Sequence, residues 1–370
     1  MIPGHPCGAG HAADGGCPDR RCFPQTAAGT GFADVADRHM PERLKLLKFW
    51  LEDELDFSEY NLKPASSDAS FRRYFRVTHD GSSFIVMDAP PEKENTRPFV
   101  AVARLLLDVG VNVPEILDER PDLGFLLLSD LGTRPYLDDL NDETVERLYG
   151  DALGALAAIQ AGASARGVLP DYDRTLLMRE MALFSDWLVG THLGIQPSAA
   201  QSIMLEQSFA RLAENALGQP QVCVHRDYHS RNLMVTQRNN PGILDFQDAV
   251  IGPVTYDLVS LLRDCYIAWP RARVEAWALG YQELALQSGI LREQHEDPVQ
   301  FLRWFDLMGV QRHLKAAGIF ARLNHRDGKP GYLNDIPRTL GYVTDVAGRY
   351  GEIAGLGVFI EDEVLSRLPG

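Results

Sequence analysis

The side chains with the clearest chemical potential lie in the segment 224–257. It contains His-Arg-Asp ending at Asp227, an asparagine five positions later (Asn232), and Asp-Phe-Gln beginning at Asp245, thirteen positions after that asparagine. This is the spacing of a catalytic loop followed by a metal-binding turn in enzymes that transfer phosphoryl groups. We therefore expect Asp227 to act as the base toward an acceptor hydroxyl. We expect Asn232 and Asp245 to bind Mg²⁺, which prefers oxygen ligands of this kind.

Each of these residues also has a structural alternative. Taken alone, Asp227 is a turn carboxylate, Asn232 a residue at a strand edge, and Asp245 a cap at a strand end. These alternatives do not explain why the three residues occur together at this spacing. His225 is expected to face the interior and to brace the loop through hydrogen bonds. Asp257 begins a helix, where it either fastens the loop or serves as an ordinary N-cap.

The composition is that of a globular enzyme long enough for two lobes. Of 370 residues, 45% are hydrophobic and 24% are charged, and the formal net charge is −15. A general binder of nucleic acid normally carries a basic face, so nucleic acid is not an expected partner. The sequence contains no uninterrupted run of about 18 apolar residues, so we expect no membrane span. No obligate protein partner is indicated. Cys223 and Cys265 lie in apolar runs, so we expect them to be small core residues with free thiols. Such cysteines are consistent with a reducing cytoplasm.

Three segments of the chain differ in their patterns. Residues 1–39 are rich in Gly, Ala, Pro, Cys and His without apolar periodicity, so we expect a disordered extension. Residues 40–132 begin with a helical pattern and continue with short apolar runs, which predicts a strand-rich lobe that binds nucleotide. Residues 133–370 are dominated by helical patterns and contain the catalytic stretch, so they are expected to bind the acceptor. The expected fold class is α+β, in a two-lobed kinase-like arrangement.

Two features depart from the usual phosphoryl-transfer pattern. In place of a glycine-rich loop stands a serine-rich run, whose small residues and hydroxyls suit phosphate contact but are also typical of a turn. The expected nucleotide contacts are Ser66, Ser67, Asp68, Ala69, Ser70 and Arg72. A strand that usually ends in a phosphate-binding lysine ends here in Met87 and Asp88. Other cations must then meet the phosphate charge, and the candidates are Arg72, Arg73, Lys93 and Arg97.

A further group of polar residues, between Gln311 and Lys329, interrupts an apolar helical pattern. Because Leu307 and Leu314 belong to a core side of this helix, we expect most of the polar side chains to form a solvated face. Arg312 is the candidate to turn toward an acceptor instead.

Several of these stretches resemble a known family. The segment 225–248 resembles the aminoglycoside phosphotransferase and choline kinase group of small-molecule kinases. Longer stretches resemble one branch, the bacterial anomeric N-acetylmuramate/N-acetylglucosamine kinases of cell-wall (peptidoglycan) recycling. These stretches are 65–76, 84–91, 124–132, 244–257 and 308–329.

The resemblance implies ATP-dependent phosphorylation of a sugar C1 hydroxyl, with an amino sugar and ATP as small-molecule partners. The site residues that it implies are Asp227 as base, Asn232 and Asp245 as metal ligands, and Arg231, Glu180 and Arg312 as sugar contacts. From its place in the loop beside Asn232, Arg231 either orients substrate or phosphate or is a solvated basic side chain. An aminoglycoside antibiotic as acceptor is the first alternative, and a non-catalytic binding module is the second. The basic residues between 311 and 329 argue against a polycationic acceptor and suit the lactyl carboxylate of N-acetylmuramate.

Overall fold

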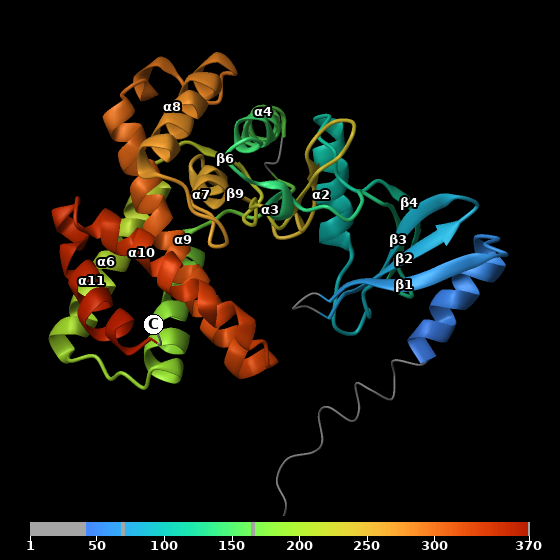
Figure 1. The fold of residues 1–370 in the computed structure, drawn as a ribbon, viewed down its shortest axis with the longest axis horizontal. Coiled ribbons are helices and arrows are strands. Elements are labelled where there is room, and N and C mark those ends of the chain that lie inside the picture. The colour runs from blue at the N-terminus through green and yellow to red at the C-terminus, as the bar shows by residue number, and fades with distance from the viewer. Residues whose placement is uncertain (1–41, 68–70, 164–166, 369–370) are drawn as a thin grey trace, which may run out of the picture. The chain divides into compact units, whose positions relative to one another are not determined.

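The structure, a computed structural model, describes residues 42–67, 71–163 and 167–368 (Figure 1). The predicted extension 1–39 lies outside these ranges. Of the described residues, those up to Phe57 belong to one compact unit and those from Ser58 onward to another. In the first unit, residues 42–49 form an α-helix that continues into η1 (Trp50–Glu54), which agrees with the helical pattern of this segment.

The second unit begins with a five-stranded antiparallel sheet in the order β1-β2-β3-β5-β4. Its strands are β1 (Tyr60–Ser67), β2 (Arg73–His79), β3 (Ser82–Asp88), β4 (Ile116–Arg120) and β5 (Phe125–Ser129). The apolar and alternating patterns predicted strands at β2, β3 and β5, because aromatic and β-branched residues fit a pleated surface. β5 lies between β3 and β4, and its first four residues are buried.

Helix α2 (Arg97–Asp108) connects β3 with β4 and was predicted from its apolar spacing. It has a proline in its first turn, where the missing N–H costs no helical hydrogen bond. Phe99, Val102, Ala103 and Leu106 recur at three- and four-residue steps and are all buried. One face of α2 therefore belongs to the core.

Four short strands surround the predicted catalytic stretch. They are β6 (Gln221–Val224), β7 (Leu233–Met234), β8 (Gly242–Ile243) and β9 (Val250–Pro253). β6 pairs with β9 and β7 with β8, both antiparallel. The loop 225–232 thus runs from the end of β6 to the start of β7, and the Asp-Phe-Gln turn follows β8.

The rest of the unit is mainly helical, as predicted. Its α-helices are α3 (Tyr136–Asp139), α4 (Val145–Gly162), α5 (Arg174–Leu183), α6 (Ala199–Leu217), α7 (Tyr256–Leu262), α8 (Arg271–Gln287), α9 (Pro298–Asp327), α10 (Ile336–Ala347) and α11 (Ala354–Phe359). Shorter turns of helix are η2 (Phe184–His192), η3 (Glu293–His295), η4 (Pro330–Asp335), η5 (Gly351–Ile353), η6 (Ile360–Val364) and η7 (Leu365–Arg367). α6 and β9 were not among the predicted elements. In the part of the chain that the structure describes, no helix has the length and apolar character needed to cross a membrane.

Helix α9 organises the helical region, since it contacts α5, α6, α7, α8 and α10 (Figure 1). Asp297 caps its first turn by accepting a hydrogen bond from the Val299 N–H (2.9 Å), and Gly328 ends it in the left-handed conformation. Gly318 allows a close approach to α5, because a Cβ there would lie 2.3 Å from the Leu183 carbonyl carbon. This glycine lets α9 pack directly on the end of α5.

One prediction about α9 is wrong. Most polar residues from 311 to 329 were expected to form a solvated face, but those of the middle turn are buried. These are Gln311, Arg312, His313 and Lys315, with exposed fractions of 0–7%. Polar side chains are buried at little cost only when they have partners, and the next subsection describes those of Arg312 and Lys315.

Candidate active site

The loop after β6 is held in place by Asp257, at the start of α7. Asp257 is buried, and its carboxylate oxygens accept hydrogen bonds from the backbone N–H groups of His225 (2.6 Å) and Arg226 (2.9 Å). Arg226 has a φ of 78°, which is uncommon for a residue with a side chain, and these bonds stabilise it. Burial raises the pKa of Asp257 to about 7, although the two N–H groups oppose this rise. Of its two predicted roles, Asp257 therefore has the role of fastening the loop.

His225 faces the interior, as expected. It is 2% exposed, and its Nδ1 accepts a hydrogen bond from the Asp227 N–H (3.2 Å). Burial lowers the pKa of His225 to about 4, so the ring is neutral at physiological pH. A neutral ring that accepts a backbone bond supports the position of Asp227 and does not itself transfer protons.

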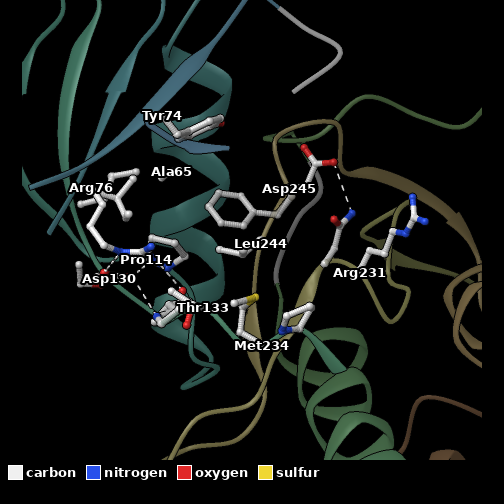
Figure 2. Close-up of a pocket in the computed structure, with 18 of the residues that line it drawn as sticks. Ala65, Tyr74, Arg76, Pro114, Asp130, Thr133, Arg231, Met234, Leu244 and Asp245 are labelled. Atoms are coloured by element: carbon white, nitrogen blue, oxygen red, sulfur yellow. Dashed lines mark hydrogen bonds and ion pairs between the residues drawn. The ribbon is translucent and has the colours of Figure 1, made fainter. Parts of the chain in front are cut away.

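The strand pair β7–β8 brings the two predicted metal ligands together. Asn232 directly precedes β7, and Leu244, directly after β8, donates its N–H to the Asn232 carbonyl (2.9 Å). The Asn232 Nδ2 lies 3.4 Å from Asp245 Oδ2, a contact drawn as a dashed line in Figure 2. The same Nδ2 donates to the Asp227 carbonyl oxygen (3.0 Å). The three residues identified by their spacing are therefore neighbours in the structure.

The turn that carries Asp245 is anchored on both sides. Asp245 has a φ of 63°, and Gln247 Nε2 donates to its Oδ1 (2.7 Å). Between them, Phe246 is fully buried and packs against Phe99 of α2, with ring centroids 4.8 Å apart. The position of this carboxylate is thus coupled to the packing of α2.

The donor set at this turn fits Mg²⁺. Among the residues that the structure describes, no three His, Cys, Asp or Glu side chains converge as they would in an all-protein metal centre. Magnesium is usually bound by one or two protein oxygen ligands, while water and substrate phosphates complete its octahedral shell. Asp245 and Asn232 suit such a site, and their role as metal ligands stays a prediction.

Asp227 is held in its ionised form by surrounding cations. Burial by itself would raise the pKa of Asp227, but positive charges, Lys315 foremost and Arg226 and Arg312 among the others, lower it to about 2. The side chain is therefore a carboxylate at neutral pH. A carboxylate can accept a hydrogen bond from an acceptor hydroxyl and orient it for attack.

These cations are organised by Glu180 of α5, which is only 5% exposed. Glu180 forms an ion pair with Arg226, and its Oε1 lies 3.4 Å from the Lys315 ammonium nitrogen. The Tyr172 hydroxyl also donates to Glu180, and Lys315 donates to the Tyr256 hydroxyl (3.0 Å). Burial opposes ionisation of Glu180, yet Lys315 and Arg226 lower its pKa. The predicted contact of Glu180 with a sugar stays a prediction, while its polar contacts in the structure are with Arg226, Lys315 and Tyr172.

Arg312 is also occupied inside the protein. It is 5% exposed, its Nε donates to the Ser260 hydroxyl (2.5 Å), and its Nη1 lies 3.5 Å from the Cys265 sulfur. These contacts explain how α9 buries a charged residue at this point. The predicted role of Arg312 in substrate binding stays a prediction.

A cavity of about 480 Å³ adjoins the catalytic loop (Figure 2). Its polar wall at one end is the segment after β5, and Arg231, Asn232 and Asp245 lie at the other end. The apolar walls between them come from the sheet, α2 and the β7–β8 pair. Their residues include Tyr74, Ile85, Phe99, Leu128, Met234 and Leu244. An apolar slot with polar groups at its ends is typical of a site for a planar ligand such as a nucleobase.

An ion pair at the far end of the cavity was not predicted. Arg76 of β2 donates to both carboxylate oxygens of Asp130 (2.6 and 3.0 Å) and to the Gly132 carbonyl (2.9 Å). Asp130 also accepts from the Ser83 hydroxyl (2.6 Å) and the Gly132 N–H (2.9 Å). The signal in the sequence was the two-residue period of β2, which places Arg76 on the same face as Tyr74, and both residues line the cavity.

The predicted nucleotide contacts are only partly described. Ser66 and Ser67 are the last residues of β1, whereas residues 68–70 lie outside the described ranges. Ala65, directly before them, lines the cavity. Arg72 lies just before β2 and is half-buried. The assignment of these residues to nucleotide binding stays a prediction.

The other proposed replacements for the strand lysine have partners on the sheet or are exposed. Arg73 forms an ion pair with the buried carboxylate of Asp88. The Lys93 ammonium nitrogen lies 4.6 Å from the ring centroid of Phe71, and Arg97 is exposed. None of these three residues lines the cavity.

Comparison with known proteins identifies the family. The sequence model of the phosphotransferase enzyme family matches residues 61–302, more than half of the chain. The chain belongs to this family. An N-acetylmuramate/N-acetylglucosamine kinase from Pseudomonas putida is 48% identical over 336 residues, which cover 87% of this chain and 98% of that protein. The kinase of the same name from Pseudomonas aeruginosa is 50% identical over 83% of this chain and 88% of its own length. The one from Neisseria meningitidis is 46% identical over 86% and 94%.

Solved structures show the same fold at low sequence identity. The choline kinase of Cryptosporidium parvum superposes with a TM-score of 0.59 at 13% identity, covering 86% of this chain and all of that chain. The ADP-bound aminoglycoside phosphotransferase APH(2'')-Ib gives a TM-score of 0.52 at 15% identity, covering 82% and 97%. The family match and these neighbours confirm the predicted α+β kinase-like fold, and the family match confirms the predicted family and a phosphotransferase.

Proposed function

We propose that this chain transfers the γ-phosphoryl group of ATP to the anomeric hydroxyl of N-acetylmuramate and N-acetylglucosamine. The observation that carries the proposal is the 46–50% identity to three kinases named for these two sugars, over 88–98% of their lengths. The similarity covers 83–87% of this chain, so it extends well beyond the loop and the turn that carry the proposed phosphoryl-transfer residues. The product would be a sugar 1-phosphate, and the role would be peptidoglycan recycling in the cytoplasm.

Asp227 is the proposed base of this reaction. Phosphoryl transfer passes through a loose transition state, so positioning and electrostatic stabilisation matter more than strong basicity. A carboxylate whose pKa is about 2 is a weak base, but it orients the hydroxyl throughout and accepts the proton as the new bond forms. An anomeric hydroxyl is more acidic than an ordinary alcohol, so a weaker base is sufficient to accept its proton.

Asn232 and Asp245 are the proposed ligands of Mg²⁺, which when bound would neutralise charge on the ATP phosphates. Their side chains lie 3.4 Å apart at the end of the cavity nearest to Asp227. The cavity between them and Arg76 would hold the adenine and ribose, and the serine-rich run 66–70 and Arg72 are the proposed contacts of the phosphates. Support for this orientation comes from the apolar walls of the cavity, which suit a base and not a triphosphate.

An acceptor screen tests the proposal. Purified protein with Mg²⁺ and ATP is offered both amino sugars, glucose and an aminoglycoside, with ADP release as the readout and phosphorus NMR to identify the product. We expect turnover with both amino sugars, a C1 phosphate as product, and a loss of at least about 10³-fold in kcat for Asp227→Asn. A product phosphorylated at C6 would disprove the anomeric assignment, and full activity of Asp227→Asn would disprove the base.

A further inference from the structure

Arg231, next to the predicted metal ligand Asn232, is held by aromatic rings and not by a carboxylate. Its guanidinium carbon lies 3.6 Å from the ring centroid of Tyr266 and 5.7 Å from that of Tyr332. Among the residues that the structure describes, no acidic side chain forms an ion pair with it, and the residue is exposed. Stacking fixes the plane of a guanidinium while it leaves the N–H groups at its edge available to a ligand.

The other cations near Asp227 are already engaged. Arg226 pairs with Glu180, and Lys315 contacts both Glu180 and the Tyr256 hydroxyl. Arg312 donates to Ser260 and Cys265 and is buried. Arg231 is therefore the cation of the catalytic loop that an incoming anion can reach without breaking an internal contact.

The side chain of Arg231 is directed away from the end of the cavity that Arg76 and Asp130 form. Figure 2 shows it at the end of the cavity opposite to Arg76 and Asp130, with its guanidinium pointing away from them. Tyr266 follows α7, and Tyr332 lies in η4. Both rings belong to the helical region, whereas the sheet supplies one wall of the nucleotide cavity. An anion bound at Arg231 would consequently lie beyond the metal ligands as seen from the base-binding end.

We propose that Arg231, stacked on Tyr266 and flanked by Tyr332, binds the lactyl carboxylate of N-acetylmuramate. This assignment rests on the proposed function. The two sugars differ only at O3, where N-acetylmuramate carries a lactyl carboxylate and N-acetylglucosamine carries a hydroxyl. A planar guanidinium binds a carboxylate through two parallel N–H···O bonds, and an oriented guanidinium loses little freedom on binding. Arg231 is thus a specificity-determining residue for the charged sugar.

The test is the selectivity between the two sugars. The readout is the ratio of kcat/KM for N-acetylmuramate to kcat/KM for N-acetylglucosamine, measured for the wild type and for Arg231→Gln. We expect this ratio to fall about 10- to 100-fold, mainly through the KM of N-acetylmuramate, because a charge-assisted pair is replaced by a neutral amide. Arg104→Gln removes an exposed arginine of α2 and serves as the matched control, whose ratio should equal that of the wild type.

A change on the substrate side completes the test. The methyl ester of N-acetylmuramate lacks the negative charge, so the wild type should discriminate against it, while Arg231→Gln should treat the acid and the ester alike. Tyr266→Leu should lower the same ratio, because it removes the ring that orients the guanidinium, and Tyr266→Phe should preserve it. Activity on N-acetylglucosamine shows in each case that the variant is folded.

The outcomes separate this assignment from the function on which it rests. An equal loss with both sugars would mean that Arg231 acts on the phosphoryl group, and would overturn the carboxylate assignment alone. An unchanged ratio in Arg231→Gln would also overturn it. A wild-type protein that phosphorylates neither sugar would overturn the proposed function, and the assignment with it.

Discussion

Replacing Lys315 by methionine is predicted to raise the pKa of Asp227 and to move the acid limit of turnover to higher pH. Among the positive charges around Asp227, that of Lys315 lowers its pKa most. Methionine has a similar length and suits a position that is only 7% exposed. As the proposed base, Asp227 acts as a carboxylate, so we expect activity to fall as the pH drops through its pKa. Removing a cation raises that pKa, and activity is then lost at a higher pH.

The size of this shift follows from the contacts that remain. A neighbouring opposite charge usually changes a carboxyl pKa by about 1–3 units. Arg226 and Arg312 still act on Asp227 in the variant, so we expect a rise of about 1–2 units from the wild-type value of about 2. Glu180 loses one cation and keeps Arg226, and we therefore expect a fall of about 1–3 kcal/mol in the free energy of unfolding, less than for a buried pair that is fully broken.

The assay is the pH dependence of kcat/KM, which reports the ionisation of the free enzyme. We expect the wild type to keep its activity down to about pH 4, and Lys315→Met to lose activity progressively below about pH 5. Lys315→Arg keeps the charge and should follow the wild type. Circular dichroism at each pH shows that the protein remains folded. Coincident acid limits for Lys315→Met and the wild type would refute the electrostatic role of Lys315.

Substitutions at three other positions test the scaffold of the site. Asp257→Ala leaves the His225 and Arg226 N–H groups unpaired, so urea titration should show a loss of about 2–4 kcal/mol in unfolding free energy. Burial raises the pKa of Asp257 to about 7 in the folded state, whereas an aspartate of the unfolded chain has a pKa of about 4. Protonation of Asp257 therefore stabilises the folded state fully below about pH 4, and this contribution is lost as the pH rises through 7. Asp257→Asn should remove that pH dependence from the unfolding free energy, and a dependence that persists would exclude Asp257 as its source. Gly318→Val should cost about 3 kcal/mol or more in thermal unfolding, since its Cβ would overlap the Leu183 backbone; a stable variant would show that α9 can shift. Arg76→Met should weaken ADP binding about 5- to 20-fold by calorimetry if the Asp130 pair orders the end of the cavity, whereas equal affinity would deny it that role.

The three central residues could be predicted because their geometry is encoded locally. Asn232 directly precedes β7, and Asp245 is separated from the end of β8 by one residue. These two strands pair as an antiparallel hairpin. Their separation in sequence therefore fixes their separation in space. Asp227 joins them because its carbonyl oxygen accepts a hydrogen bond from the Asn232 side chain. The spacing of these residues in the sequence predicts their proximity because the paired strands β7 and β8 constrain the chain between them.

Lys315 and Arg76 could not be predicted in the same way, because their roles depend on partners distant in sequence. A lysine four residues after Gln311 on an amphipathic helix is normally solvated. Lys315 is buried because the approach of α9 to α5, permitted by Gly318, places Glu180 beside it. Helical periodicity reports which face of a helix is polar. It does not report which polar face will meet a buried carboxylate on another helix.

The structure also indicates which positive charges remain near the site in the absence of a phosphate-binding lysine at the end of β3. β3 ends in Met87 and Asp88, both fully buried, and Asp88 is paired with Arg73. The Arg76 guanidinium is likewise neutralised, by Asp130. In the described part of the sheet, these two ion pairs add no net positive charge beside the cavity. The helical region, by contrast, surrounds Asp227 with more cations than Glu180 alone can balance. We infer that charge stabilisation in this chain comes from the helical region and the predicted metal ligands and not from the sheet, and that the cations of the helical region favour the ionised form of Asp227.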